Sequence, residues 1–329
     1  MHICHIILTS RFAGSERYAV DLANASVERH QVSVILRKSA AQNRPDAIAH
    51  RFDPRIKVHE VSDWFSGFFA RRLLRQIRPE IIHAHLSAAC KSAARVNVGK
   101  RVATLHIEYK PQQHAKLDGL IAIAPWQLAK MPEPMRARSV QINNWVVPRA
   151  ASVGARARLR AQLGIAPETV LIGSVSRLEP SKGVDVLLSA FARLQGVDAH
   201  LVIIGQGSAA KALQNAAPVG VSFVGFSSVP QDYLAAMDVF ISASRSEPFG
   251  LVILEAMSAG LPILASASAG AQHLARHIKR PLLPIGDVAA LHYALLEIIK
   301  KAPQRITYEL SEFDQETSVH AIEAFYQAL

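Results

Sequence analysis

The sequence has little cysteine, few aromatic residues and no long hydrophobic run. Cys4 and Cys90 are the only cysteines among 329 residues, which excludes a disulfide scaffold and favours a reducing compartment. No apolar run reaches the ~18 residues of a membrane-spanning helix. The first ten residues, MHICHIILTS, lack the basic start and cleavage site of a signal peptide, so we interpret them as a strand. We therefore expect a cytoplasmic protein.

Acidic residues are scarce in the first half only. Residues 1–150 hold 23 Lys/Arg and 11 Asp/Glu, whereas residues 151–329 hold 14 and 15. A one-sided basic surface attracts nucleic acid, anionic lipid or a phosphorylated substrate. The alternative is a solvated surface whose charge bias has no function.

Strand and helix patterns alternate along the whole chain. Short, nearly continuous apolar runs are typical of parallel strands covered on both faces. Between the runs lie helical stretches such as Glu16–Glu28 and Phe69–Ile77, so we predict α/β domains with doubly wound, Rossmann-like sheets. The runs are His2–Leu8, Val32–Leu36, Ile56–Val61, Ile81–Leu86, Val102–Leu105, Gly119–Ala124, Val140–Ile142, Val170–Val175, Leu201–Ile204, Val221–Val224, Val239–Ser242 and Pro262–Ala265.

An Ala- and Arg-rich stretch with one Pro and one Gly, residues 147–160, marks the expected domain junction. We predict an N-terminal domain over 1–148, a C-terminal domain over 149–312 and a last helix over 313–329. Two such domains leave a cleft, and ligands of doubly wound sheets bind outside the carboxyl ends of the strands.

The segment 238–266, DVFISASRSEPFGLVILEAMSAGLPILAS, carries the sharpest signal. It predicts a strand, a turn, a helix over 249–259 and a second strand, with Gly260 ending the helix. A helix N-terminus after a parallel strand offers free N–H groups to phosphate. The carboxylates of Glu247 and Glu255 are suited to sugar hydroxyls. The alternative is a structural unit with two exposed glutamates.

A second segment, VLIGSVSRLEPSKGVDVLLSAFARL at 170–194, places two cations after a strand. Arg177 offers a forked donor and Lys182 a mobile point charge, a combination suited to a diphosphate. The alternative is a solvated basic loop.

The third segment, LVIIGQGSAA at 201–210, fits the dinucleotide pattern G-x-G-x-x-A, a weak signal alone. A nicotinamide site needs an acid ~20 positions later, but the next strand ends in Gly225 and Phe226. An oxidoreductase is therefore disfavoured. We interpret these glycines as letting the backbone approach a ligand at the wall of the cleft, and we expect Gly205, with Val224 on the next strand, to lie against that ligand.

These three segments, in this order, resemble the retaining glycosyltransferases of family four, which have the GT-B fold of two Rossmann-like domains facing a cleft. The resemblance covers nearly the whole second half. It implies that Arg177 and Lys182 hold the donor diphosphate, that Glu255 holds the ribose and that Glu247 touches the transferred sugar. It also implies contacts to sugar and phosphate from the amides of Phe249, Gly250 and Leu251.

The first half resembles the family through two features. Residues 13–17, AGSER, correspond to its glycine-rich loop with the first glycine missing, so Gly14 is expected at the donor. His106, at the end of VATLH, fits the family's histidine beside the reacting sugar. Ala124 and Asn144-Trp145 depart from the family pattern on the acceptor side. The family's last helix returns to the first domain, and residues 317–328 are patterned to do so.

We expect no metal ion. There is no Asp-x-Asp sequence, and Arg177, Lys182 and the helix dipole would replace the metal at the diphosphate. His83 and His85 alternate on one strand, but no third ligand stands at a suitable spacing. Glu312, Asp314 and Glu316 are interpreted as capping the last helix.

The resemblance thus implies a retaining, metal-independent hexosyltransferase with no cofactor. Its donor would be a nucleotide-diphosphate sugar and its acceptor a saccharide or lipid-linked saccharide, as in lipopolysaccharide or other polysaccharide biosynthesis. The alternatives are a non-catalytic protein that binds nucleotide sugars or polyanions and a GT-B sugar-nucleotide epimerase. We expect no nucleic-acid partner.

An aromatic–basic segment, residues 64–78 (WFSGFFARRLLRQIR), suits the interface of an anionic bilayer. Together with the basic first half, it predicts peripheral association with the inner face of the plasma membrane. The alternative is an ordinary helix that packs on the sheet through Leu73, Leu74 and Ile77.

Overall fold

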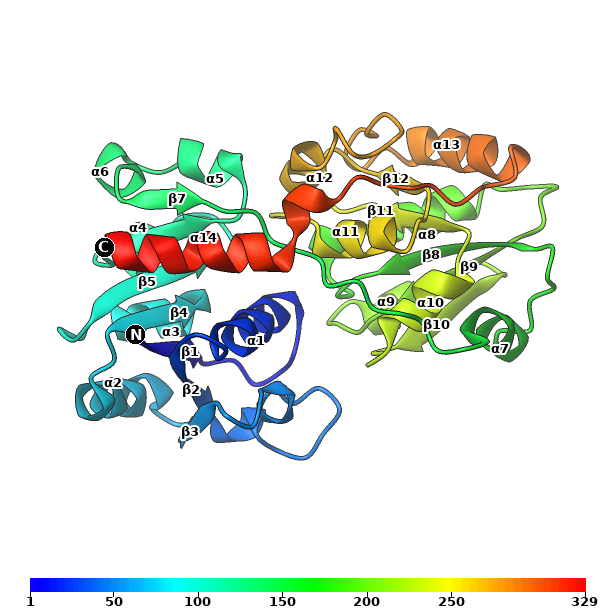
Figure 1. The fold of residues 1–329 in the computed structure, drawn as a ribbon. Helices are drawn as coiled ribbons and strands as arrows, with labels where there is room; N and C mark the ends of the chain where they lie inside the picture. Colours follow the sequence, from blue (N-terminus) through cyan, green and yellow to red (C-terminus); the bar gives the residue numbers. More distant parts are fainter. The chain divides into compact units, whose positions relative to one another are not determined.

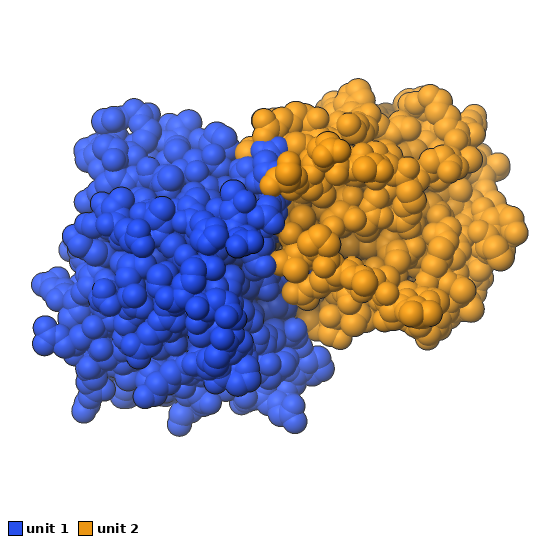
Figure 2. All heavy atoms as spheres, in the orientation of Figure 1, with its two compact units in different colours: residues 1–145, 312–329 blue, residues 146–311 orange.

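The protein, described here as a computed structural model of residues 1–329, consists of two compact units. Unit 1 contains Met1–Trp145 and Glu312–Leu329, and unit 2 contains Val146–Ser311 (Figures 1 and 2). Each unit is built around one parallel sheet. None of the helices combines the length and the apolar character that crossing a membrane requires.

The sheet of unit 1 has seven parallel strands. They are β1 (His2–Ile7), β2 (Gln31–Arg37), β3 (Lys57–Val61), β4 (Ile81–His85), β5 (Lys100–Leu105), β6 (Gly119–Ala122) and β7 (Ser139–Gln141). Their order is β3-β2-β1-β4-β5-β6-β7, so the direction of winding reverses between β1 and β4. Such a reversal is the switch point at which doubly wound sheets bind ligands.

Helices cover both faces of this sheet. They are α1 (Gly14–Ser26), η1 (Lys38–Ala40), η2 (Ala49–Arg51), α2 (Ser66–Ile77), α3 (Leu86–Ala93), α4 (Pro111–His114), α5 (Pro125–Ala129), α6 (Glu133–Arg136), η4 (Ser311–Phe313) and α14 (Gln315–Ala328). Helices α1 and α14 pack on one face, where Leu22 and Ile322 meet Ile3. Helices α2 and α3 pack on the other, around Cys4. Figure 1 shows α14, in red, lying along this unit.

The sheet of unit 2 has five parallel strands. They are β8 (Val170–Val175), β9 (Ala199–Ile204), β10 (Val221–Gly225), β11 (Val239–Ser242) and β12 (Ile263–Ala265). Their order is β10-β9-β8-β11-β12, which puts the switch point between β8 and β11. The helices are α7 (Ala155–Gln162), η3 (Pro180–Lys182), α8 (Val184–Phe191), α9 (Ala210–Asn215), α10 (Pro230–Ala236), α11 (Leu251–Ser258), α12 (Ala269–His273) and α13 (Val288–Lys300).

The predicted fold class of two doubly wound α/β domains is confirmed. The largest difference within the predicted site concerns α11, which begins at Leu251 and not at Phe249. Gly250 has a φ of +94°, a left-handed conformation that glycine adopts without strain. Because this residue turns the chain immediately before the helix, Phe249 belongs to the turn.

Candidate functional site

The switch point of unit 2 brings two predicted site residues into contact. Lys182 ends η3 after β8, and Glu247 lies in the turn after β11. The Lys182 Nζ and Glu247 Oε2 atoms are 2.6 Å apart, and both side chains are largely buried. The sequence predicted Lys182 for the diphosphate and Glu247 for the sugar, and the fold places the two charges beside each other at the ligand-binding edge of the sheet.

A close approach of two backbone loops makes this contact possible. Gly183 has a φ of +64°, and a Cβ atom added there would lie 2.0 Å from the Ala243 carbonyl oxygen. The backbone N–H groups of Arg245 and Ser246 donate to the Ser181 carbonyl oxygen at 2.9 and 3.1 Å. The loop that carries Lys182 is therefore joined directly to the loop that carries Glu247.

Arg177 lies in the same loop as Lys182 but in a different setting. Its side chain is 61% exposed, and its Nη1 atom donates to Glu179 Oε1 at 2.6 Å. A diphosphate that uses Arg177 has to draw it away from Glu179. The structure thus separates the two predicted cations into a buried one at the switch point and an exposed one beside it.

The turn before α11 presents backbone donors. Gly250 is the N-cap, so the N–H groups of the first helical turn, beginning with Leu251, point out of the helix end. The Phe249 side chain is buried, and the Gly270 N–H donates to the Glu247 carbonyl oxygen at 2.7 Å. Glu255 lies in the second turn of α11 and is partly buried. Helix amides and a carboxylate thus accompany the Lys182–Glu247 pair.

One other predicted donor residue, Gly205, has a structural explanation that it shares with Gly207. A Cβ atom at Gly205 would lie 1.8 Å from the Ser176 carbonyl oxygen, and one at Gly207 would lie 2.3 Å from that of Leu178. The glycines of the G-x-G-x-x-A pattern therefore let the loop after β9 pack on the loop after β8. Val224 is partly buried on β10. A donor role for Gly205 or Val224 stays a prediction.

In unit 1, the loop after β1 depends on a residue that the sequence analysis did not assign. Gly14 is exposed and begins α1. The buried Glu16 carboxylate accepts hydrogen bonds from Thr9 Oγ1 at 2.7 Å and from the Ala13 N–H at 3.2 Å. Glu16 thus holds the loop that presents Gly14. Glu16 stands three residues after Ala13, the N-cap residue of α1, and the acid of a capping box occupies that position. This spacing in the sequence could have identified Glu16.

His106 belongs to a row of hydrogen-bonded histidines. Its Nε2 atom is 3.3 Å from His85 Nδ1, and His85 Nε2 is 3.1 Å from His5 Nδ1. Burial lowers the pKa of His5 and of His106 to about 3 and that of His85 well below its usual value. The imidazoles are therefore neutral near pH 7. Tyr18 contacts the His106 ring edge-on at a centroid distance of 5.1 Å.

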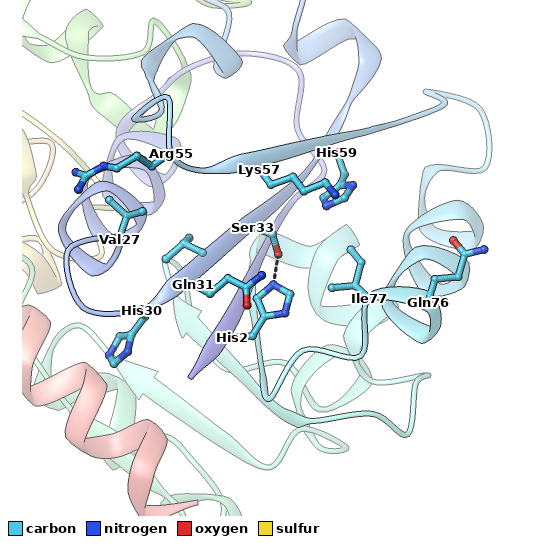
Figure 3. A pocket seen from close by; sticks show the side chains of 11 residues that line it. His2, Val27, His30, Gln31, Ser33, Arg55, Lys57, His59, Gln76 and Ile77 are labelled. Carbon is cyan, nitrogen blue, oxygen red and sulfur yellow. Dashed lines mark hydrogen bonds between the residues drawn. The ribbon is translucent and has the colours of Figure 1, made fainter.

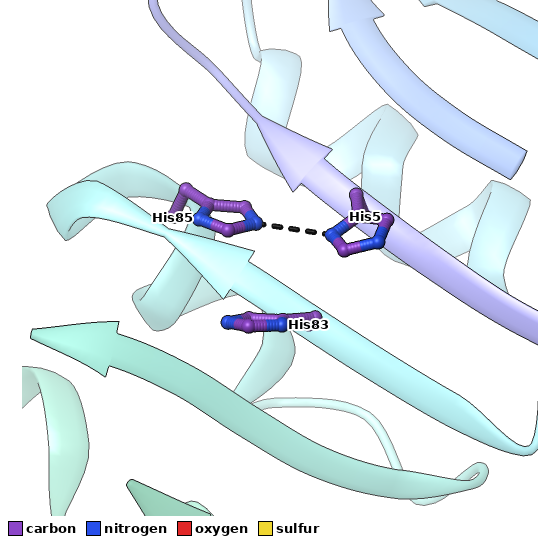
Figure 4. A group of neighbouring side chains, drawn as sticks. All are labelled: His5, His83 and His85. Carbon is purple, nitrogen blue, oxygen red and sulfur yellow. Dashed lines mark hydrogen bonds between the residues drawn. The ribbon is translucent and has the colours of Figure 1, made fainter. Parts of the chain in front are cut away.

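The structure also supplies the third histidine that the sequence lacked for a metal site. His5 on β1 joins His83 and His85 on β4, and one nitrogen from each lies within 4.8 Å of the others (Figure 4). Strand pairing opposes His5 to His83, although they are far apart in sequence. The third histidine that the sequence did not provide beside His83 and His85 is therefore present in the fold.

The geometry of this cluster fits hydrogen bonding better than metal binding. Both nitrogens of His83 are engaged, with the Tyr326 hydroxyl at 2.5 Å and Thr104 Oγ1 at 2.8 Å. The His83 and His85 rings stack with a centroid distance of 4.3 Å and 19° between their planes. Figure 4 shows the two rings lying nearly parallel. Lone pairs of nearly parallel rings run side by side, whereas a tetrahedral site needs them to converge.

Comparison with known proteins agrees with this architecture. The glycosyltransferase family 4 model matches residues 12–171, and the glycosyl transferases group 1 model matches residues 155–309. The lipopolysaccharide core biosynthesis glycosyltransferase LpsE of Rhizobium meliloti is 34% identical over 166 residues, which cover 49% of this chain and 48% of LpsE. LpsD of the same organism is 26% identical over 309 residues, covering 90% of this chain and 87% of LpsD. The chain spans about half the length of the first curated relatives that it matches.

Among solved structures, Anabaena HepE in complex with UDP and glucose superposes with a TM-score of 0.81 at 20% identity, over 100% of both chains. The superposition covers both units, so the fold of the whole chain is the GT-B fold. Because the two family models together match residues 12–309, the chain belongs to the glycosyltransferases, with a family 4 N-terminal half and a group 1 C-terminal half.

Proposed function

We propose that this protein is a retaining, metal-independent glycosyltransferase that moves a sugar from a nucleotide-diphosphate sugar to a saccharide or lipid-linked saccharide. The observation that carries the proposal is the contact of Lys182 with Glu247 at the switch point of unit 2. A cation for the diphosphate and a carboxylate for the sugar stand side by side there. HepE, whose structure contains UDP and glucose, supports such a donor by its shared fold.

The donor site works electrostatically. The diphosphate leaving group gains negative charge as the glycosidic bond breaks. Lys182, Arg177 and the amides at the start of α11 stabilise that charge most strongly in the transition state, which is where binding accelerates a reaction. These groups take the role that a divalent ion has in metal-dependent enzymes.

The pairing of Glu247 supports retention without a covalent intermediate. A carboxylate 2.6 Å from an ammonium group is a weakened nucleophile. We propose that Glu247 holds sugar hydroxyls, that the acceptor attacks from the side of the departing phosphate and that this phosphate takes the acceptor proton. Neutral His106 donates a hydrogen bond to the sugar and carries no positive charge near pH 7.

Nucleotide titration tests the donor site. We expect Lys182→Ala to weaken UDP or GDP binding by about 2 kcal/mol, the scale of a charge-assisted hydrogen bond. Arg177→Ala should have a smaller effect because that side chain is exposed and paired with Glu179. Lys211→Ala, at an exposed lysine of α9, is the matched control. Unchanged nucleotide affinity in both the Lys182 and Arg177 variants would refute the assignment.

Turnover of labelled donor separates an enzyme from a non-catalytic binding protein. Glu247→Gln should lower the rate of sugar transfer or donor hydrolysis while nucleotide affinity stays within about twofold, because Glu247 meets the sugar. Equal losses of rate and of affinity would place Glu247 at the nucleotide instead.

We propose further that unit 1 docks on an anionic membrane surface through residues 64–78. The side chains of Trp64, Phe65 and Phe68 are 82%, 80% and 54% exposed. Helix α2 packs on the sheet through Ala70 and Leu74. The exposure of the aromatic residues at and before its start supports the proposal. The exposed arginines of this stretch are Arg72, Arg75 and Arg78.

Exposed aromatic rings beside arginines are typical of proteins that lie at a bilayer interface. Each basic side chain near an anionic surface contributes about 1 kcal/mol, which suffices for reversible docking. Docking would bring the enzyme to a lipid-linked acceptor.

Vesicle sedimentation at low salt tests this docking. Recovery on anionic vesicles should exceed recovery on neutral ones and should fall in Phe65→Ser. Tyr293→Ser, at an aromatic residue of unit 2 that is 68% exposed, is the control and should bind as the unaltered protein does. Equal recovery on both vesicle types, or no binding, would leave only a soluble acceptor.

A further inference from the structure

A pocket of about 580 Å³ opens at the amino-terminal edge of the unit 1 sheet. Residues at or near the starts of three neighbouring strands line it, namely His2 of β1, Ser33 of β2 and Lys57 of β3 (Figure 3). Gln76 and Ile77, at the end of α2, close one side. The switch point between β1 and β4 lies at the opposite edge of the sheet, so this pocket is separate from Gly14 and His106.

The pocket has an apolar part, formed by Val27, Val32 and Ile77, and a polar part that contains no carboxylate. Its basic members are His2, His30, Arg55, Lys57 and His59. Lys57 is exposed and forms no ion pair, and Figure 3 shows its side chain extending toward His59. Arg55 is already engaged by Glu28 and Asp53. Lys57 is therefore the cation that an entering anion meets.

Buried ring nitrogens in the pocket lack partners. His59 Nε2 and both ring nitrogens of His30 are shielded from solvent without a hydrogen bond. The nearest carboxylate to His30, that of Glu323, stands 3.6 Å from Nε2. Buried polar atoms without a partner are rare and costly in folded proteins. A phosphomonoester offers acceptor oxygens to an imidazole N–H and, as its monoanion, an O–H group to an imidazole lone pair.

Two other polar groups of the wall are partners of each other. His2 Nε2 and Ser33 Oγ lie 2.9 Å apart in the wall, as the dashed line in Figure 3 marks. Burial lowers the pKa of His2, His30 and His59, and for His59 the charge of Lys57 lowers it further. These imidazoles are therefore neutral hydrogen-bonding groups near pH 7, and the unpaired positive charge of the pocket is that of Lys57.

We infer that this pocket is an anion site, distinct from the donor site, that binds a phosphomonoester group. The group has two sources of the same chemistry, a lipid headgroup or a soluble phosphorylated molecule. The end of α2 in the pocket wall connects the site to the segment proposed for docking, but the inference rests on the pocket alone.

The first experiment that tests this site is a titration with inorganic phosphate in solution. It uses the full chain saturated with UDP, so that the donor site is filled, and follows the imidazole resonances of His2 and His59 by NMR. We expect phosphate to shift these resonances in a saturable way. The affinity for phosphate should be about tenfold weaker in Lys57→Gln and in His59→Gln, because each variant loses one charge-assisted contact. Lys116→Gln, at an exposed lysine of unit 1 outside the pocket, should bind phosphate unchanged.

The lipid arm uses vesicles that carry phosphatidic acid, a phosphomonoester, or phosphatidylglycerol, a phosphodiester, at matched surface charge. A preference for phosphatidic acid that Lys57→Gln abolishes identifies a lipid headgroup. Phosphate binding that depends on Lys57, without a lipid preference, identifies a soluble ligand. If phosphate moves neither resonance and neither pocket variant changes phosphatidic acid binding, the inference is overturned.

Discussion

At the scale of single residues, Gly183 is the position on which the candidate site most depends. It combines a left-handed backbone with a contact to the Ala243 carbonyl oxygen, and both conditions exclude a side chain. Lys182 and Glu247 meet only because these two loops touch. The residue types were visible in the sequence, but the requirement for glycine at 183 comes from a neighbour 60 positions away.

We therefore expect Gly183→Ala to cost more stability than a substitution that adds left-handed strain alone. Gly164 is the matched control, because its φ is +68° and a Cβ atom there has nothing within 4 Å. Gly164→Ala should lower the free energy of unfolding by about 1 kcal/mol, from backbone strain. Gly183→Ala should lose clearly more and should also weaken UDP binding. If urea unfolding gave the same loss of unfolding free energy for Gly183→Ala and Gly164→Ala, the loops that carry Gly183 and Ala243 would be able to move apart without cost.

At the scale of secondary-structure elements, α14 shows how a helix from the end of the chain completes the first sheet. Asp314 caps it by accepting the Thr317 N–H at 2.8 Å, as the acidic cluster predicted. Val319, Ile322 and Tyr326 then pack in one core cluster with Ile3 of β1. Residues at the two ends of the chain thus share one core.

Removing the central contact of α14 should destabilise unit 1. Ile322 is fully buried, so Ile322→Ala should cost about 2–5 kcal/mol, the usual range for such a cavity. Gln327→Ala, on the exposed face of the helix, should cost far less. Tryptophan fluorescence reports on this unit, because Trp64, Trp126 and Trp145 all lie in it. A loss for Ile322→Ala as small as that of the control would mean that α14 is docked only loosely.

At the scale of the whole molecule, the buried histidines of unit 1 make stability depend on pH. The pKa values of His5, His83, His85 and His106 are all lowered by burial. Below pH ~6.5 the unfolded chain binds protons at these positions and the folded protein does not. Stability therefore rises with pH between about 3 and 6.5 and levels off above that range.

Urea unfolding of unit 1 at a series of pH values measures this effect. We expect the free energy of unfolding to fall by about 1 kcal/mol per buried histidine for each pH unit below 6.5. His5→Gln should lower by one the number of protons taken up on unfolding, and so make the dependence on pH less steep. His320→Gln, at an exposed position of α14, should leave the slope unchanged. A flat profile between pH 5 and 6.5 would contradict neutral, buried imidazoles.

The sequence by itself determined the strands of this protein and the types of residue at its predicted donor site. Nearly continuous apolar runs marked all twelve strands, because burial on both faces leaves a local pattern. Lys182, Glu247 and Arg177 were predicted for the donor site because loops after parallel strands are where ligand-binding residues stand. The exposure of Trp64 and Phe65 was left open, since aromatic residues at helical spacing serve a core as well as a surface.

Only the tertiary structure decided which of these residues meet. Strand order placed β8 beside β11 and so paired Lys182 with Glu247, and it placed β1 beside β4 and so added His5 to His83 and His85. The same pairing gathered the starts of β1, β2 and β3 into the pocket around Lys57. Local periodicity encodes burial and direction, but it does not encode which distant strand becomes a neighbour, because that choice depends on how the whole sheet packs.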